Sequence, residues 1–147
     1  MGVDIYGSNP KTKEGEYFRS NWWFWRPIVT LMEHAAPDLW ENVLLGTNDG
    51  DGFDTEGCDR MVAALEKMDW KEKIYLQQAL QEVMPDVPCD LCNGTGTRDD
   101  IPELSCCCNK CYGKGKVRPQ ECSYPYDIEL TKEFINFLQN CGGFAIH

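Results

Sequence analysis

Histidine is scarce in this 147-residue chain, which contains only His34 and His147. No serine or cysteine has a histidine near it in sequence, and neither a phosphate-binding loop ending in Gly-Lys-Ser/Thr nor a Gly-x-Ser-x-Gly turn is present. His34 ends an apolar helical stretch and is more typical of a structural residue than of a catalytic base. The sequence therefore favours a protein that is not an enzyme.

Long apolar runs are absent as well. No run approaches the roughly 18 residues that a membrane span requires, and the first residues lack the basic-then-apolar pattern of a secretion signal. We expect a cytoplasmic protein. Nine cysteines in such a chain favour metal binding or free thiols over disulfides.

The composition does allow a folded core. Hydrophobic residues make up 42% of the chain and include five Trp, six Tyr and six Phe, and a domain of this length buries roughly 68–70% of the surface of its unfolded chain. We predict a single domain, 1–147, with a mainly helical α+β fold. It consists of a compact helical body, a short terminal β pairing and a four-cysteine zinc-knuckle hairpin, 86–118, inserted between helices.

Two Cys-x-x-Cys pairs carry the clearest signal. Cys89/Cys92 and Cys108/Cys111 are separated by 15 residues, and this is typical of four thiolates around one tetrahedral zinc ion. Four thiolates leave no open coordination position, so we predict one structural Zn²⁺. Cys106 and Cys107 precede Cys108 directly, and either remains an alternative ligand. A redox role for the Cys106–Cys108 cluster is a further alternative.

The same x-Gly-x-Gly tail follows each cysteine pair. Glycine adopts positive φ at little steric cost, so Gly94 and Gly113 are expected to turn the chain beneath the metal and direct backbone N–H groups at the sulfurs. The predicted knuckle turns are Gly94, Gly96, Gly113 and Gly115.

Hydrophobic periodicity and capping residues predict the remaining elements. Strands are expected at 3–6 and 144–146, paired with each other. Helices are expected after the capping residues Asn21, Asp54 and Asp127, and over 73–84. Pro27 predicts that the first helix either is kinked or begins at Arg26 or Pro27.

Tryptophans and isolated cysteines have a structural and a functional interpretation. The apolar face that includes Trp22 and Trp25 favours core packing, with an exposed partner-binding face as the alternative. Cys58, Cys122 and Cys141 are expected to be small buried hydrophobic residues.

Charge is unevenly distributed around a net value of −10. Lys and Arg are absent from 27–59, which is rich in Asp and Glu, whereas 104–120 has four basic residues and, after Leu104, no acid. Candidate partner-binding residues are therefore Asp49, Asp51, Asp54, Glu56, Lys110, Tyr112, Lys114, Lys116 and Arg118. Calcium binding by the acidic loop is disfavoured, because a calcium loop with Asp49 and Asp51 at positions three and five would place Cys58 where the bidentate glutamate belongs.

The segments CDLCNGTG and CNKCYGKG resemble the C-x-x-C-x-G-x-G repeat of the cysteine-rich domain of DnaJ-type co-chaperones. That domain carries four repeats and two zinc ions, whereas this chain has two repeats and lacks a His-Pro-Asp tripeptide, so co-chaperone activity is not implied. The MGVDIYG, NWWFWRP and CGGF segments resemble small uncharacterised proteins of bacteria and their phages. This resemblance implies the cytoplasm of a bacterial host cell.

Three functional hypotheses follow. In the first, an acidic, zinc-binding interaction protein engages a protein or nucleoprotein partner, for example as a phage inhibitor of a host defence nucleoprotein (an anti-CRISPR protein) that mimics nucleic-acid charge. In the second, the knuckle contacts nucleic acid through its lysines and Tyr112. The third is a DnaJ-like thiol or chaperone module. No membrane partner is expected.

Overall fold

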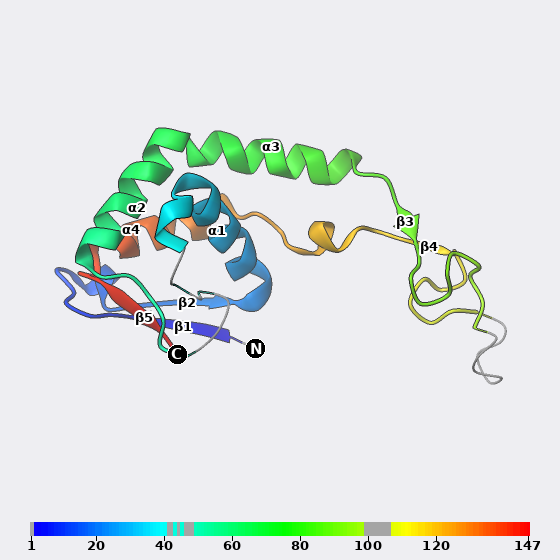
Figure 1. Ribbon diagram of the computed structural model, residues 1–147, viewed down its shortest axis with the longest axis horizontal. Coiled ribbons are helices and arrows are strands. Elements are labelled where there is room, and N and C mark those ends of the chain that lie inside the picture. Colours follow the sequence, from blue (N-terminus) through cyan, green and yellow to red (C-terminus); the bar gives the residue numbers. More distant parts are fainter. Residues whose placement is uncertain (1, 41–42, 44, 46–48, 99–106) are drawn as a thin grey trace. The chain divides into compact units, whose positions relative to one another are not determined.

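The computed structural model describes residues 2–40, 43, 45, 49–98 and 107–147 (Figure 1). The chain divides into two compact units. The body comprises Met1–Gln78 and Tyr124–His147, and the knuckle unit comprises Ala79–Ser123. The predicted knuckle range, 86–118, lies within the second unit. The prediction of a mainly helical α+β fold is confirmed.

The body contains a three-stranded antiparallel sheet of β1 (Gly2–Gly7), β2 (Tyr17–Asn21) and β5 (Phe144–Ile146), in the order β2-β1-β5. The predicted pairing of the two terminal strands is confirmed, with Ile5 opposite Ile146. Sequence reasoning missed β2, although its alternation of buried and exposed residues is the period-2 signal of a strand.

Helix α1 (Trp22–Ala35) begins before Arg26 and Pro27, the two starting residues that Pro27 had suggested. The Asn21 side chain accepts a hydrogen bond from the Phe24 N–H at 3.1 Å, which caps the helix at this point. Pro27 therefore lies inside the helix, and a start at Arg26 or Pro27 is wrong. Pro27 has no N–H to donate to the Trp23 carbonyl one turn earlier.

The other two predicted caps are confirmed. Asp54 accepts from the Gly57 N–H ahead of α2 (Thr55–Met68), and Asp127 accepts from the Leu130 N–H ahead of α4 (Ile128–Asn140), both at 2.8 Å. Between them, α3 (Trp70–Val83) begins three residues before the predicted Lys73. Among the described residues, short 3-10 helices lie at η1 (Lys13–Gly15), η2 (Pro37–Trp40) and η4 (Gln120–Ser123).

An aromatic core lies between the sheet and the helices of the body. Phe134 of α4 contacts Phe18 of β2 and Trp25 of α1, each with ring centroids 5.1 Å apart. Trp25 is completely buried, and its indole N–H donates to the Leu45 carbonyl at 2.9 Å. The core interpretation therefore holds for Trp25, whereas Trp23 is 55% exposed and packs against Tyr124.

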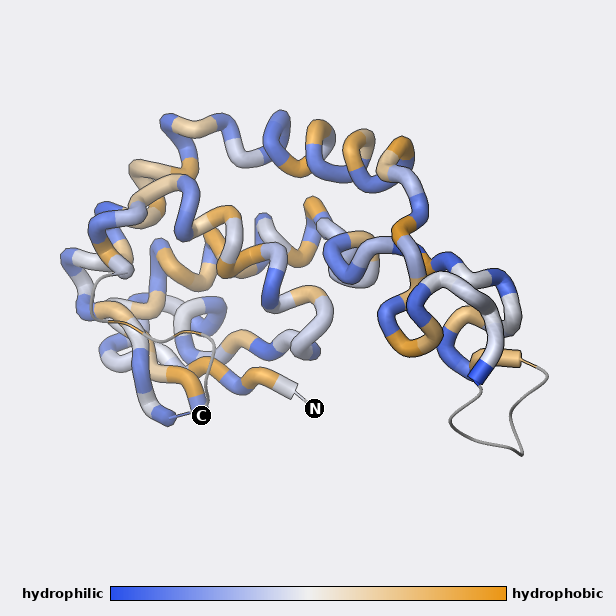
Figure 2. Tube along the Cα trace, turned by 45° about the vertical axis from the view of Figure 1, so that its right-hand side comes forward, coloured by the Kyte–Doolittle hydropathy of each residue, from blue (hydrophilic) through white to orange (hydrophobic). Residues whose placement is uncertain are grey.

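Helix α3 alternates hydrophobic and hydrophilic residues along its length (Figure 2). Trp70 and Ile74, near its start, are buried in the core of the body. Leu76, Leu80 and Val83 helped to predict this helix, and all three are exposed. The periodicity thus identified the helix without deciding which of its apolar residues are buried.

Candidate metal centre

The two cysteine loops of the knuckle unit have the same backbone conformation. In the first loop the Gly94 N–H donates to the Cys89 carbonyl at 3.0 Å, and in the second the Gly113 N–H donates to the Cys108 carbonyl at 3.3 Å. The backbone angles match as well, with φ near 51° at Asn93 and 52° at Tyr112. A shift of 19 residues therefore relates each position of one loop to its equivalent in the other.

Each loop also closes the other. The Cys89 N–H donates to the Gly115 carbonyl at 2.9 Å, and the Cys108 N–H donates to the Gly96 carbonyl at 2.7 Å. At their base, β3 (Val87–Pro88) pairs antiparallel with β4 (Lys116–Val117). These reciprocal bonds hold the two cysteine pairs face to face.

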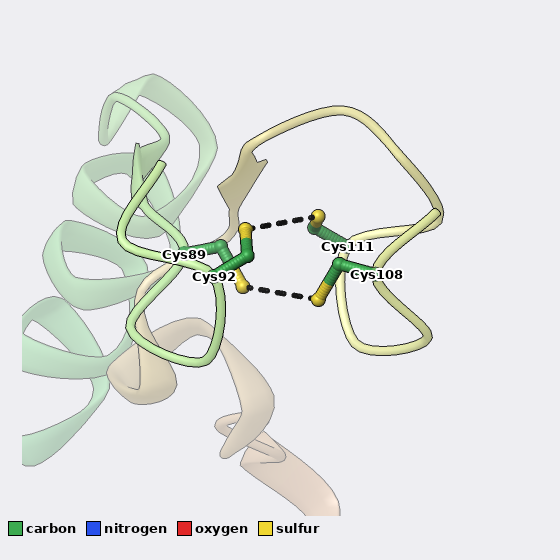
Figure 3. Close-up of side chains that lie close together, drawn as sticks. All are labelled: Cys89, Cys92, Cys108 and Cys111. Carbon is green, nitrogen blue, oxygen red and sulfur yellow. Dashed lines mark hydrogen bonds between the residues drawn. The ribbon is translucent and has the colours of Figure 1, made fainter. Parts of the chain in front are cut away.

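The four sulfurs converge as metal ligands do (Figure 3). All of them lie within 4.8 Å of one another. The Sγ atoms of Cys89 and Cys108 are 3.9 Å apart, and those of Cys92 and Cys111 are 3.8 Å apart. A tetrahedral site with metal–sulfur bonds of about 2.3 Å has sulfur–sulfur edges of roughly 3.8 Å, and a disulfide requires only about 2.05 Å. The cluster therefore fits a metal ion, and its cysteines are free thiols.

The four thiols of the cluster are buried. The four cysteines are between 0% and 6% exposed, and they form a small hydrophobic cluster of their own with Val117 beside it. A buried thiolate without a partner would be costly. A shared metal ion would remove that cost and would join the two loops.

Glycine is required in the loops for two different reasons. Gly94 and Gly113 have φ of 81° and 80°, as predicted, and nothing crowds the position of a side chain there. At Gly96 and Gly115 a Cβ atom would also lie 2.5 Å and 2.3 Å from a carbonyl oxygen of the opposite loop. Close approach of the two loops therefore excludes a side chain at the second glycine of each tail.

The second glycines also supply the N–H groups that point at sulfur. The Gly96 N–H donates to the Cys92 Sγ and the Gly115 N–H to the Cys111 Sγ, both at 3.2 Å. The predicted turns at Gly94 and Gly113 thus aim backbone N–H groups at the sulfurs, and the N–H groups of Gly94 and Gly113 themselves close those turns. Such bonds stabilise thiolates and hold the ligands in position.

Ionisation of the first cysteine pair is uneven before a metal binds. Burial raises the pKa of Cys89 to about 11, against hydrogen bonds from the backbone N–H groups of Cys92 and Leu91. Burial also opposes ionisation of Cys92, but the Gly96 N–H and the neighbouring thiols outweigh it and lower its pKa to about 7. Cys92 is therefore the thiol of this pair that ionises more readily.

Two of the four predicted basic partner-binding residues have partners inside the knuckle unit. Lys110 pairs with Asp90 at 2.6 Å, which raises the pKa of Lys110 and lowers that of Asp90. The Arg118 guanidinium donates to the Gln81 and Met84 carbonyls at the end of α3, 3.6 Å from Asp86. Arg118 therefore caps a helix C-terminus.

The acidic candidates lie in the body, and two of them support the fold. Asp54 caps α2. The Asp51 carbonyl accepts from the Ile146 N–H at 2.9 Å, and Phe53 likewise pairs with Phe144 at 2.8 Å, so this segment runs along β5. Asp49, Asp54 and Glu56 are exposed. Thr47, at the first position of the disfavoured calcium loop, lies outside the described residues.

The remaining cysteines divide into three kinds. Cys58 and Cys141 are buried with their sulfurs 3.7 Å apart, a contact that sequence reasoning missed because 83 residues separate them. Cys122 is half-buried beside Met84. Cys107 is not part of the four-sulfur cluster, and Cys106 lies outside the described residues.

No protein-family model, curated protein or solved structure matches this chain. In the part of the chain that the structure describes, no helix combines the length and apolar character needed to cross a bilayer.

Proposed function

We propose that this chain is a non-enzymatic interaction protein whose four clustered cysteines bind one structural Zn²⁺. The single observation that carries the proposal is the sulfur geometry, with two loop-to-loop distances of 3.8 and 3.9 Å among four buried thiols. A tetrahedral four-sulfur site suits zinc or iron, whereas calcium and magnesium require oxygen ligands. Zinc is favoured because closed sites of four cysteines on Cys-x-x-Cys loops are typical structural zinc sites.

A closed centre supports a structural role for the metal. Four thiolates occupy every position of a tetrahedral ion, so neither water nor a substrate can be activated there. Apart from the cysteines themselves, the cluster contacts only Val117 among the partly buried hydrophobic residues that the structure describes. The metal thus takes the place of a hydrophobic core in the knuckle unit, and binding contributes on the order of 10–16 kcal/mol to its folding. The resulting surface is then available to bind a partner.

Metal analysis of the purified chain tests the proposal directly. We expect one zinc per chain, loss of the ordered knuckle on chelation while the body stays folded, and recovery on adding zinc. Substitution with Co²⁺ should give the visible absorption of a tetrahedral thiolate site. Cys89→Ser should reduce metal binding, whereas Cys122→Ser, at a cysteine outside the cluster, should not. A purified chain that contains iron, or no metal, would contradict the assignment.

A cationic nucleoprotein is the partner that we propose for the acidic segment of the body. The support is the run of exposed carboxylates at Asp49, Asp54 and Glu56 in a part of the sequence without Lys or Arg. Charge reversal at Asp49 and Glu56 should weaken binding, and the effect should diminish at high salt. Asp54 is left unchanged in this test because it caps α2. Binding that persists after charge reversal would exclude the nucleic-acid-mimic proposal.

A further inference from the structure

The internal repeat of the knuckle shows which residues the loop conformation requires and which it does not. Because the two loops share one backbone, each residue of the second loop can be compared with its equivalent in the first. Asn93, Thr95 and Thr97 of the first loop are replaced by Tyr112, Lys114 and Lys116 in the second. One metal site and one backbone thus carry two different surfaces.

Tyr112 is the residue that the fold explains least. Its φ of 52° lies in the left-handed region, which asparagine tolerates and bulky residues rarely adopt. The equivalent residue of the first loop, at φ 51°, is Asn93. The Tyr112 side chain is nevertheless 83% exposed, so burial does not compensate for the backbone strain. Strain held at an exposed aromatic residue points to a role in binding.

Lys114 and Lys116 follow this tyrosine, and they differ from Lys110 and Arg118 in their interactions within the knuckle unit. Lys110 pairs with Asp90, and Arg118 caps α3. Lys114 and Lys116 are exposed and make no ion pair within the described residues. In the first loop the residue equivalent to Lys114 does have an internal role, because the Thr95 hydroxyl donates to the Cys92 carbonyl at 2.7 Å. The second loop therefore presents one ring and two exposed cations within five consecutive residues.

We infer that Tyr112, Lys114 and Lys116 form a binding surface for single-stranded nucleic acid. An exposed tyrosine ring stacks on any unpaired base, and lysines two and four residues away neutralise phosphates of the same strand. An acidic protein would use the lysines but would leave the ring without a specific partner. The inference rests on the proposed function, since the loop requires its metal to fold.

Binding of the zinc-loaded full chain to a fluorescein-labelled 12-residue oligothymidylate or oligouridylate tests this surface. We expect the affinity to fall by about 5- to 150-fold in Tyr112→Asn, which is the loss of one stacked base. Tyr112→Phe should retain most of the affinity. With two phosphate contacts, the logarithm of the affinity should fall with the logarithm of salt concentration with a slope of about −1.4.

Zinc affinity separates a binding role of Tyr112 from a structural one. Because asparagine tolerates the left-handed conformation, Tyr112→Asn should bind zinc as well as or better than the unchanged chain. If Tyr112 instead stabilised the loop, the Tyr112→Asn variant would bind zinc more weakly, and that result would overturn the inference. Lys114→Ala should weaken oligonucleotide binding more than Lys110→Ala, the matched control whose lysine is already paired.

Three further results would overturn the inference while leaving the zinc proposal intact. In the first, the zinc-loaded protein does not bind the oligonucleotide. In the second, Tyr112→Asn binds it with the same affinity as the unchanged chain. In the third, polyglutamate competes for binding as effectively as the unlabelled oligonucleotide does. The last result would indicate an acidic protein partner. Absence of zinc from the purified protein would instead refute the proposed function.

Discussion

Replacing single glycines with alanine tests how the knuckle is built. Gly113 and Gly115 both have positive φ, at 80° and 72°, so alanine at either position costs about 1 kcal/mol of backbone strain. They differ in their surroundings. A Cβ atom at Gly113 has no neighbour closer than 3.6 Å, whereas at Gly115 it would lie 2.3 Å from the Gly94 carbonyl oxygen of the opposite loop.

This clash can be relieved only by separating the two loops by about 1 Å, since ordinary contact begins near 3.4 Å. That movement breaks or weakens the two hydrogen bonds between the loops, from the Cys89 N–H to the Gly115 carbonyl and from the Cys108 N–H to the Gly96 carbonyl. Each such bond contributes about 0.5–1.5 kcal/mol. With the backbone strain, the total for Gly115→Ala is about 2–4 kcal/mol, against about 1 kcal/mol for Gly113→Ala.

At the proposed zinc site, zinc affinity should report this difference, because metal binding and folding are coupled in small zinc-binding units. At about 1.4 kcal/mol per factor of ten, Gly115→Ala should weaken zinc binding by about 30- to 700-fold and Gly113→Ala by about fivefold. Competition with a chelator of known affinity measures both. Equal losses in the two variants would refute the reasoning, because they would show that backbone conformation alone governs the site.

Further predictions concern the core, a helix cap and the protons of the metal site. Trp25→Phe removes the N–H that donates to the buried Leu45 carbonyl, and it should lower the free energy of unfolding of the body in urea by about 2 kcal/mol or more. Trp23→Phe, at an exposed residue, should change this free energy by less than about 0.5 kcal/mol. Asp54→Ala removes the cap of α2 and should cost about 1 kcal/mol, and a similar cost for Asp49→Ala would contradict the capping role. At about pH 8, zinc binding should release a proton from Cys89, whose pKa is about 11, and little from Cys92, whose pKa is about 7. Below about pH 7 Cys92 also binds a proton, so zinc affinity should fall more steeply with decreasing pH in that range. Calorimetry in buffers of different ionisation enthalpy counts these protons, and a proton count that does not rise on acidification through the pKa of Cys92 would exclude this ionisation pattern.

Local signals in the sequence were enough for much of the fold. Asn21, Asp54 and Asp127 predicted three helix starts because a cap depends on residues within one turn of each other. The one error at these starts came from Pro27, whose rigid ring suggested a later beginning of α1 than the Asn21 cap allows. Strand β2 was missed because its alternating pattern spans only five residues and the aromatic run of α1 follows it directly.

The sequence alone determined the four clustered cysteines and the glycine tails, since spacing decides which ligands can meet at one ion. Only the tertiary structure decided that no side chain fits at Gly96 and Gly115, because a Cβ atom at either position would meet a carbonyl oxygen of the opposite loop. It also decided which charges are paired. Lys110 and Lys114 look alike in the sequence, but only the folded knuckle brings Asp90 to the first of them. The partner of a particular side chain depends on contacts between distant segments, and these contacts cannot be read from the order of residues along the chain.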